Sequence, residues 1–531
     1  MTTTIEADDL HLGTFSEQGP WSLAQRAPVW RKGVDRLRIE QTALVPRLVR
    51  RPRLPPLRRA ATVARIVGWN LGIWAVRDRK RPDSSAALAH RVRESAERLG
   101  TTYIKLAQII SAGEGIFPSA LVDECKKCRD QVPAESYETV VATIERELGR
   151  PMHEVFLNFE PVALAAASIA QVHAATLRTG ESVVVKVRRP DIDQVVYRDL
   201  RVLAWLGPLL VGRIPVSALA NPPALVDLFA ETIVEELDFR VEGANMLDVA
   251  RVLLETGQGN FVVPRPHPEL VTEQVLVMER VDGFRFDDAV GMRAAGIDTE
   301  AVLKTGLLGF LEGAFLHGVF HGDLHGGNLF VMQDGRTALV DFGITGRLDQ
   351  SERLAFLRLM MAATTNDAHG QVEAIRDLGA LPPDTDVAAV VRDLGLDGPP
   401  IDPTLLAPDE LVAELRRILK ALLAYGARMP KPLMLYVKNF IFLDGAIANL
   451  APQLDMFAAL TEIATHFAVT HGASISSQLG QPAGPWELDL DGLKASFGVD
   501  PATTDHFTYA ELRERRALIR KRLGSRALTE R

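Results

Sequence analysis

Apolar residues recur along this chain with two different periods, and the change of period divides it into segments. Between residues 60 and 150 they return every three or four positions, as in RVRESAERLGTTYIKLAQIIS, which is typical of helices buried along one face. Further on they alternate or run together with β-branched residues, first in VALAAASIAQVHAATL and then, after the turn RTGE, in SVVVKV. This second pattern predicts a hairpin of two strands.

The same patterns continue beyond the hairpin. They predict a helix over 222–250, a strand at EQVLVMERV and a long apolar helix over 299–318. Two short strands are expected within HGDLHGGNLFVMQDGRTALVDFG, followed by helices to about residue 470. Strands followed by helices, with polar motifs where they meet, predict an α+β protein of two lobes.

Length and charge add an anionic partner to this picture. At 531 residues the chain is too long for one hydrophobic core, and its 47% hydrophobic and 24% charged residues are ordinary for a globular protein. The net charge of -8 is uneven, because residues 26–59 hold eleven Lys and Arg against Asp35 and Glu40. A basic arm on an acidic body indicates an anionic surface as partner, either nucleic acid or lipid headgroups.

Cysteines and apolar runs indicate the compartment. Cys125 and Cys128 are the only cysteines, so we expect no disulfide framework and a reducing compartment. Their spacing would suit zinc or redox chemistry, but matching ligands are not nearby, and ordinary helix cysteines are expected. No signal peptide is visible, and the longest apolar run, 203–212, is too short to span a bilayer. We expect a cytoplasmic protein, or one peripheral on a membrane.

The strongest chemical signal is HGDLHGGN (321–328) followed by VDFG (340–343). Asp323 and Asn328 have the spacing of a kinase catalytic loop, and Asp341 lies in a DFG tripeptide. Phosphoryl transfer concentrates negative charge, so Mg²⁺ must bridge the phosphates through hard oxygen ligands. We expect Asn328 and Asp341 to bind Mg²⁺ or Mn²⁺, and Asp323 to orient or deprotonate the nucleophile.

Two histidines flank Asp323 in this motif. Because Mg²⁺ disfavours imidazole, His321 and His325 are expected to be turn and packing residues rather than metal ligands.

A second signal is Lys186, at the centre of the apolar strand VVVKV. A buried lysine needs an anion, and kinases supply a nucleotide phosphate and a helix glutamate. The alternative is a lysine whose stem reaches out of an edge strand. No G-x-G-x-x-G precedes Lys186; alanines and two other residues replace it, and these allow close backbone approach but not the positive φ of glycine.

The segment after the DFG tripeptide is short. Asp349 and Glu352 predict a helix that begins at once with a capping box. No room is left for an activation segment, and no A-P-E follows, so the peptide platform of ordinary protein kinases is lacking.

In these blocks the chain resembles the UbiB/AarF family of atypical kinase-like proteins, over roughly residues 95–450. The resemblance rests on AAASIAQVHAA, VVVKVRRP, EELDFRVEGAN, HGDLHGGN and VDFG, which occur in one order. It implies a two-lobed protein-kinase-like fold that binds ATP, with Lys186 and Asp323 as catalytic residues. Glu242 would pair with Lys186, although Glu235 is an alternative.

The resemblance also implies a nucleotide loop and a hinge. The loop that holds ATP would consist of Ala165, Ala166, Ala167, Ser168, Ile169 and Ala170. The hinge would follow the strand, where backbone groups around Glu279 and Val281 take the adenine.

A regulatory motif is implied as well, K-x-G-Q in a helical extension over the active site. Here it is Lys105-Leu106-Ala107-Gln108, and Lys105 is expected to reach Glu236 and Asp238. Ala107 stands where the family has glycine, which puts close packing of this helix in doubt. Gly326 stands where the family usually has proline, and a looser turn is expected there.

These expectations define five parts of the chain. They are a basic, partly disordered arm (1–60), a helical extension (61–150), a kinase-like N-lobe (151–282), a helical C-lobe (283–472), and a linker with a basic amphipathic helix (473–531).

Three functions are compatible with these parts. The first is an ATPase or a small-molecule or lipid phosphotransferase in isoprenoid-quinone or lipid metabolism, working with enzymes of those pathways. The second is a nucleotide-gated membrane scaffold with little turnover, and an ordinary protein kinase is the least favoured. Residues 21–59 have only two aromatic residues, Trp21 and Trp30, and no nucleic-acid-binding module, so an anionic membrane surface is the expected partner.

Overall fold

The computed structural model describes residues 28–111, 117–128, 133–210, 222–398, 410, 417–418, 421–422, 424–427, 430–480, 489–496, 499–500, 502 and 504–526. The first 27 residues of the basic arm lie outside the described residues. The chain divides into two units, Met1–Gly283 with Ala338–Thr345, and Phe284–Thr337 with Gly346–Arg531. Each unit is described by itself.

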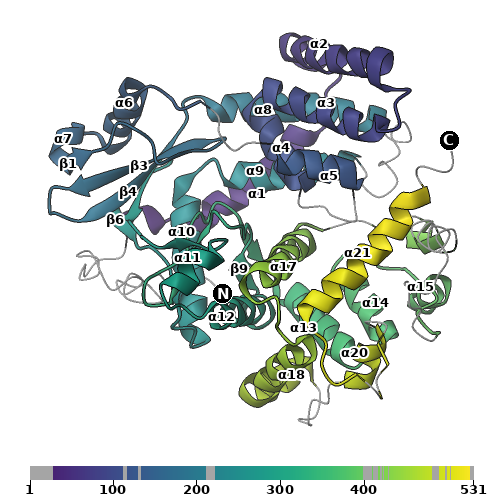
Figure 1. Cartoon of the computed structure of the whole chain (residues 1–531). Helices are drawn as coiled ribbons and strands as arrows, with labels where there is room; N and C mark the ends of the chain where they lie inside the picture. Colours follow the sequence, from purple (N-terminus) through teal and green to yellow (C-terminus); the bar gives the residue numbers. More distant parts are fainter. Residues whose placement is uncertain are drawn as a thin grey trace. The chain divides into compact units, whose positions relative to one another are not determined.

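The first unit is built on an antiparallel sheet (Figure 1). Its strands are β1 (Phe156–Phe159), β2 (Ala165–Ala166), β3 (Ala170–Leu177), β4 (Ser182–Arg188), β6 (Pro266–Val271) and β7 (Val275–Glu279). Their order is β1-β3-β4-β7-β6, with β2 paired to β3. The predicted hairpin is confirmed as β3 and β4, in which Lys186 lies opposite Val172.

The two faces of this sheet are covered by different helices. Val183, Val185 and Val187 of β4 are buried against Val140 and Ile144 of helix α6 (Tyr137–Leu148). Because side chains alternate along a strand, Lys186 points to the opposite face, where helix α10 packs against β6 and β7. The Lys186 ammonium therefore lies on the face of β4 opposite the apolar core formed with α6.

Helices make up most of the rest of the first unit. They are α1 (Val34–Val49), α2 (Leu57–Ile73), α3 (Ser84–Leu99), α4 (Thr101–Ser111), α5 (Ser119–Lys126), α6, α7 (Met152–Val155), α8 (Ile192–Leu210), α9 (Pro222–Glu235) and α10 (Phe239–Glu255). The helix expected over 222–250 is two helices, because Asp238 caps a new start at Phe239. The cysteines are free and buried, one of them within α5, and burial raises the pKa of the Cys125 thiol to about 12.

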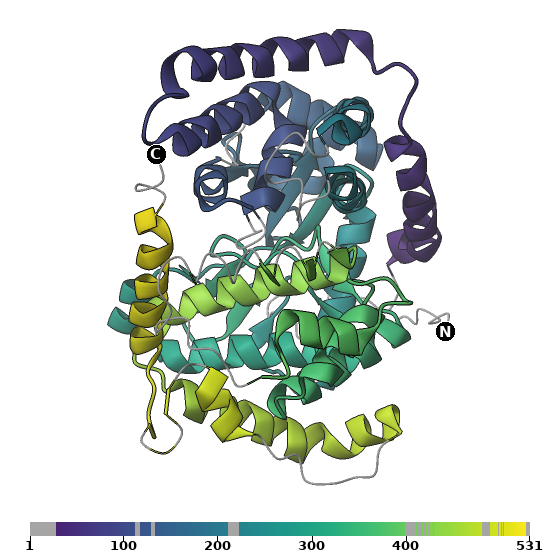
Figure 2. The ribbon, with the colours of Figure 1, turned by 90° about the vertical axis from the view of Figure 1, so that its right-hand side faces the viewer.

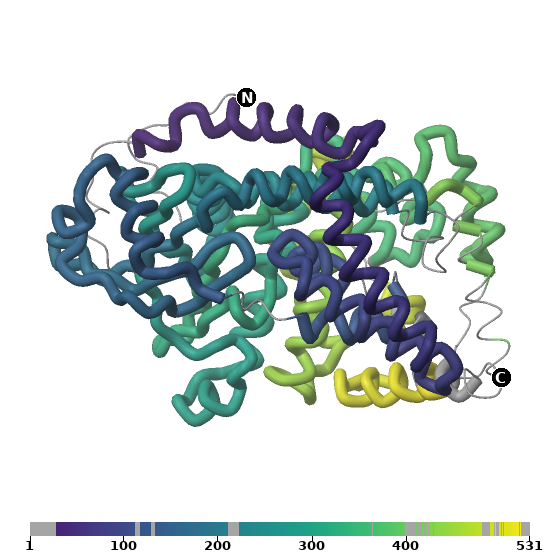
Figure 3. The backbone as a smooth tube through the Cα atoms, turned by 90° about the horizontal axis from the view of Figure 1, so that it is seen from above, coloured from purple at the N-terminus to yellow at the C-terminus, as the bar shows by residue number. Residues whose placement is uncertain are grey.

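The portion of the arm that the structure describes, residues 28–60, contains helix α1 and the start of α2. From Val34 the chain is helical, with Pro46 inside α1, and Figure 3 shows α1 in purple alongside the teal helices α8 and α9. Three basic side chains of this portion pair with acidic residues of α8 or α10, namely Arg31 and Arg38 with Asp248, and Arg59 with Asp199. Part of the basic charge is therefore used for folding.

The second unit is mostly helical (Figure 2). Its elements are β8 (Phe284–Arg285), α11 (Ala289–Ala294), α12 (Thr299–Glu312), the π-helical turn η6 (Gly313–His317), β9 (Val319–His321), β10 (Leu329–Val331), α13 (Gln350–Thr364), α14 (Ala368–Asp377), α15 (Val387–Leu394), α17 (Lys431–Leu450), α18 (Met456–His466), the π-helical turn η7 (Phe467–His471), α19 (Gly472–Leu479), α20 (Leu490–Ser496) and α21 (Tyr509–Arg526). The short strands β11 (Thr337–Leu339) and β12 (Thr345–Arg347) stand where the chain passes between the units.

The boundaries of two segments test the sequence analysis. The predicted capping box is confirmed, because Asp349 accepts the Glu352 N–H and Glu352 accepts the Asp349 N–H at the start of α13. The segment 473–504, expected to be a linker, is instead helical in α19 and α20 where it is described.

One long apolar helix of the second unit, α17, was not noticed in the sequence analysis. By length and composition alone α17 is apolar enough to cross a membrane, with a mean hydropathy of 1.3. It is the one such helix in the described parts of the chain. Its Asn439 is fully buried and bonded to backbone groups of β9 and the loop that follows, which is the behaviour of a core helix in a folded unit.

The ion pair of Arg59 with Asp199 predicts a stability effect. The Asp199 carboxylate is 0% exposed, and Arg59 binds both of its oxygens at 2.5 and 2.9 Å. Arg59→Ala leaves this carboxylate buried without its partner and should lower the free energy of unfolding by about 3 kcal/mol. Arg58→Ala, on the exposed side of the same helix, should change the urea midpoint little; equal effects of the two variants would contradict the pairing.

Candidate functional site

The buried ammonium of Lys186 is the centre of the site in the first unit. Its Nζ lies 2.8 and 2.9 Å from the two carboxylate oxygens of Glu242 and 2.8 Å from Oδ1 of Asp341. Of the two glutamates weighed from the sequence, Glu242 on α10 is therefore the one at the lysine. The ring of Phe239 lies 5.4 Å from the same Nζ.

The electrostatics of this cluster favour a charged lysine. Burial alone would lower the pKa of Lys186, but the carboxylates of Asp341 and Glu242 more than offset it and raise the pKa. Two carboxylates around one ammonium leave an excess of negative charge, and Asp341 is half exposed. A further cation at Asp341 would be stabilised by this excess.

The DFG segment is held in an unusual backbone conformation. Asp341 has φ 61°, in the left-handed region that non-glycine residues rarely adopt. Phe342 is fully buried, and its carbonyl accepts a hydrogen bond of 2.9 Å from Asn245 of α10. Helix α10 thus positions both the glutamate and the DFG backbone against one lysine.

The helical extension reaches the same segment. Lys105 of α4 forms an ion pair of 2.8 Å with Glu236, whose Cγ would lie 3.4 Å from a Cβ placed on Gly343. Asp238, the other expected partner of Lys105, caps α10 and binds Arg240 at 2.6 Å. The K-x-G-Q-like motif is thereby brought beside the DFG glycine.

The rest of that motif lies on the same helix. Gln108 follows Lys105 by three positions on α4, so the two share a face. The departure at Ala107 leaves the helix closely packed, because Ala107 is buried in α4 where it packs against α3, α5, α8 and α9.

The alanine-rich loop is a tight hairpin between β2 and β3. The Ala167 N–H donates to the carbonyl of Ala170 at 2.8 Å, and Ser168 and Ile169 at the turn are buried. Its backbone has negative φ throughout, as expected for alanine in place of glycine. This geometry supplies a stiff loop at the start of the lysine hairpin.

The sequence analysis missed Arg189, whose side chain holds this loop in place through hydrogen bonds. Its side chain donates to the carbonyls of Ala167 and Pro133 and pairs with Glu135 at 2.7 Å. Since these partners are 22 to 56 residues away, no spacing in the sequence points to them.

The expected hinge follows β7. The Glu279 N–H donates to the Arg265 carbonyl, and the Glu279 carboxylate accepts the Arg265 N–H at 2.8 Å. Glu279 therefore connects the end of β7 to the start of β6. A purine bound there would use other backbone groups of the segment, among which Val281 is the half-buried candidate.

The loop 321–328 belongs to the second unit. Asn328 donates from Nδ2 to the Asp323 carbonyl at 3.0 Å, which fixes the orientation of its side-chain amide. His321 and His325 each accept, at Nδ1, the backbone N–H two residues further on. They are turn residues, as predicted. At the Gly326 departure, a Cβ would lie 3.2 Å from the Asp287 carboxyl.

Helix α17 supplies two residues that the sequence analysis did not identify. Lys438 donates from Nζ to Oδ1 of Asp323. Asn439 accepts the Leu324 N–H at 2.9 Å and donates to the carbonyl of His321. The loop is therefore clamped on both sides of Asp323, by residues more than a hundred positions away that no local motif announces.

The residues present fit Mg²⁺ and a nucleotide when each unit is taken by itself. In the first unit Asp341 offers a half-exposed carboxylate beside a charged lysine, and in the second Asn328 offers an amide oxygen; both are hard ligands. When bound, Mg²⁺ would neutralise phosphate charge.

The lysine hairpin, its helix glutamate and the DFG segment are arranged as in a protein-kinase-like domain, within the α+β fold that the sequence predicts. Comparison with known proteins agrees with this class, because residues 127–375 match the model of the ABC1 atypical kinase-like domain. The chain belongs to this family, which includes the UbiB and aarF-domain kinases, and the resemblance found in the sequence is confirmed.

Three relatives show how far the similarity extends. An uncharacterised protein of Mycobacterium tuberculosis is 36% identical, over 76% of this chain and 84% of its own. The probable protein kinase UbiB of Aeromonas salmonicida is 30% identical, over 71% of this chain and 70% of its own. An uncharacterised aarF domain-containing chloroplast protein kinase of Arabidopsis thaliana is 30% identical, over 69% and 72%.

The geometry at Asp341 predicts metal-dependent nucleotide binding. Asp341→Asn keeps the size of the side chain and a donor-acceptor contact to Lys186 but removes the anionic ligand. It should abolish the Mg²⁺-dependent part of the thermal shift caused by ATP. Asp334→Asn, in an exposed turn seven positions earlier in the sequence, should keep the full shift. An unchanged shift in Asp341→Asn would refute the metal assignment.

Proposed function

We propose that this protein is an ATP- and Mg²⁺-dependent ATPase or phosphotransferase whose acceptor is a small molecule or lipid. The observation that carries the proposal is the Lys186 ammonium, held between Glu242 and Asp341. Such a lysine anchors nucleotide phosphates in kinases, and membership of a kinase-like family supports ATP as the nucleotide. The relatives named UbiB favour isoprenoid-quinone metabolism as the setting.

The second unit supports turnover. In the proposed reaction Asp323 accepts the proton of the attacking hydroxyl, and the bond to the terminal phosphoryl group of ATP breaks as the new one forms. Lys438, hydrogen-bonded to this carboxylate, orients it and adds positive charge where phosphoryl charge develops. Asn439 keeps the loop backbone in place.

An ordinary protein kinase is disfavoured by the length of one segment. Residues 344–348 alone separate the DFG tripeptide from the N-cap of α13. A bound peptide would lack the platform that an activation segment provides.

A scaffold with little turnover remains the second candidate, and the Lys105–Glu236 pair favours it. This pair holds the helical extension against Gly343, so access to the DFG segment depends on breaking a buried ion pair. A steady-state ATPase assay with and without anionic liposomes separates the two functions, because a gated scaffold should stay inactive in both.

Membrane association, which we include in the proposal, is supported by helix α2. Its outward surface carries Leu57, Arg58, Arg65, Trp69 and Leu71, all exposed. Between Glu40 and Asp78 the sequence holds no acidic residue. In Figure 2 α2 runs along the outer edge of its own unit. An amphipathic helix of this kind lies in the headgroup region of an anionic bilayer.

The other basic helix is less suited to this task. Arg516 of α21 pairs with Asp444 at 2.7 Å, and Tyr509 donates to the same carboxylate. These contacts dock the described part of α21 on α17.

Turnover should depend on Asp323 and Lys438. Asp323→Asn should lower kcat by about 10²–10⁴-fold, with nucleotide affinity within a few-fold, because the residue serves the nucleophile rather than the phosphates. Lys438→Met should also lower kcat, and Lys438→Arg should recover part of it.

The control for Lys438 is Lys304→Met, which removes an exposed lysine of α12 paired with Glu300 and Glu462. It should leave kcat unchanged. ATPase activity of Asp323→Asn within a few-fold of the unchanged protein would move the catalytic role elsewhere.

Membrane binding should depend on α2. Arg58→Ala with Arg65→Ala removes two cations worth about 1 kcal/mol each near an anionic surface, so partitioning should fall by roughly 30-fold. Trp69→Glu should weaken it further by charging the apolar surface. The measurement is co-sedimentation with phosphatidylglycerol vesicles, and added salt should reduce binding.

Leu518→Glu on α21, which also replaces an exposed apolar residue of a basic helix, is the matched control and should bind normally. Equal binding to neutral phosphatidylcholine vesicles, or loss caused only by Leu518→Glu, would refute the assignment to α2.

A further inference from the structure

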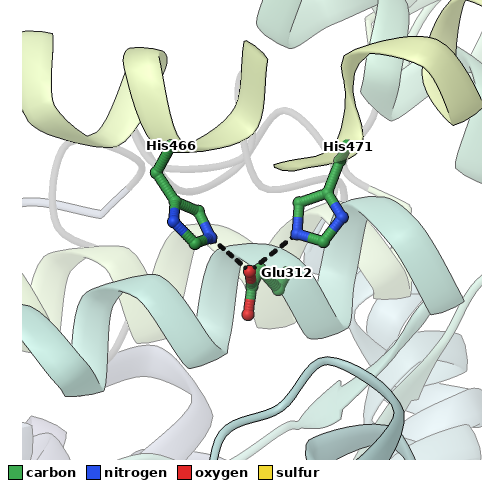
Figure 4. A group of neighbouring side chains, drawn as sticks. All are labelled: Glu312, His466 and His471. Atoms are coloured by element: carbon green, nitrogen blue, oxygen red, sulfur yellow. Dashed lines mark hydrogen bonds and ion pairs between the residues drawn. The ribbon is translucent and has the colours of Figure 1, made fainter. Parts of the chain in front are cut away.

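A fully buried carboxylate in the second unit is contacted by two histidines. Glu312, the last residue of α12, is 0% exposed. Its Oε1 lies 2.7 Å from Nε2 of His466 and 2.8 Å from Nε2 of His471. Figure 4 shows both imidazoles pointing at this carboxylate from α18 and η7. None of the three residues lies in the 321–328 loop, and none has a part in the proposed phosphoryl transfer.

The backbone is bent to bring the two histidines together. In an α-helix five positions advance about 500°, which would leave their side chains about 140° apart. The chain between them is instead the π-helical turn η7, in which residues five apart follow one another on the same face. A second π-helical turn, η6, begins directly after Glu312. Such turns are rare and often mark functional sites.

The surroundings make this carboxylate costly without a cation. Phe467 is 1% exposed and lies against both imidazoles, with ring centroids 6.1 Å from His466 and 5.7 Å from His471. Phe315 packs on Phe467 from η6. A metal ion bound between the two imidazoles and the Glu312 carboxylate would bring positive charge into this apolar setting.

We propose that Glu312, His466 and His471 form a binding site for a divalent transition metal of the zinc type. Ligand atoms of the three residues lie within 4.8 Å of one another, and two nitrogens with one carboxylate oxygen suit Zn²⁺ rather than Mg²⁺. Binding requires each Nε2 lone pair, so the ring proton of each imidazole moves to Nδ1. The nitrogen–oxygen separations must widen by roughly 0.6 Å to surround an ion with bonds of about 2.1 Å.

The fourth position would be taken by water, because His466 is a third exposed and opens the site to solvent. The metal would join the end of α12 to the α18–η7 segment. Its chemistry separates it from the nucleotide metal, whose expected ligands are oxygens.

The test is metal binding by the purified full-length protein after chelation and dialysis. Calorimetry with Zn²⁺ should show one equivalent bound, unaffected by excess Mg²⁺, and Co²⁺ should give the visible spectrum of a tetrahedral nitrogen-ligated site. His466→Gln and His471→Gln keep a hydrogen-bond donor to Glu312 but lose the imidazole ligand. Each should weaken Zn²⁺ binding by about 100-fold or more while leaving the thermal midpoint of the metal-free protein nearly unchanged.

His369→Gln, which removes an exposed histidine of α14 in the same unit, is the control and should bind Zn²⁺ normally. If the unchanged protein binds Zn²⁺ only at millimolar concentration, or if both glutamine variants bind as it does, the two histidines merely satisfy Glu312 and the proposal is wrong.

Discussion

A charged lysine in the middle of a buried strand imposes the main constraint on the first unit. An ammonium removed from water must be matched by anions, or it loses its charge. Because Val183, Val185 and Val187 turn the other face of β4 into the core, Lys186 can be matched only from the side where α10 packs. This requirement brings Glu242 and the DFG aspartate together, and it explains why one short segment, 338–345, belongs to the unit of the sheet rather than to the unit that precedes and follows it in sequence.

The same requirement governs how the basic arm and the helical extension are attached. Arg31, Arg59 and Lys105 reach carboxylates of α10, α8 and the α9–α10 junction, respectively, at 2.6, 2.5 and 2.8 Å. Attachment of a segment by ion pairs differs from attachment by an apolar face. The charged groups of an ion pair can bind water or another ion when the two segments move apart. An extension held in this way is suited to a switch, since a competing charge near Glu236 changes the balance directly.

The sequence analysis predicted those elements that depend on local sequence patterns. The strand period predicted β3 and β4, the Asp349–Glu352 spacing predicted a helix start, and the DFG and 321–328 motifs marked the chemistry. Two contacts were missed because their residues are distant in sequence. Lys438 reaches Asp323 across 115 residues, and His466 reaches Glu312 across 154, so no spacing announces either contact. The helical residues after Val34 were missed for another reason, because Pro46 and clustered arginines hide a helix that is held by tertiary ion pairs.

Residues 344–348 form a short segment between the DFG tripeptide and α13, and its packing bears on the kind of acceptor that can bind. A Cβ on Gly346 would lie 2.2 Å from the ring of Phe320, so this segment must pass flat over a buried aromatic residue, which itself lies against Phe310 and Tyr436. A longer insertion or a larger residue would displace that ring. The segment therefore cannot extend into a surface that aligns a peptide.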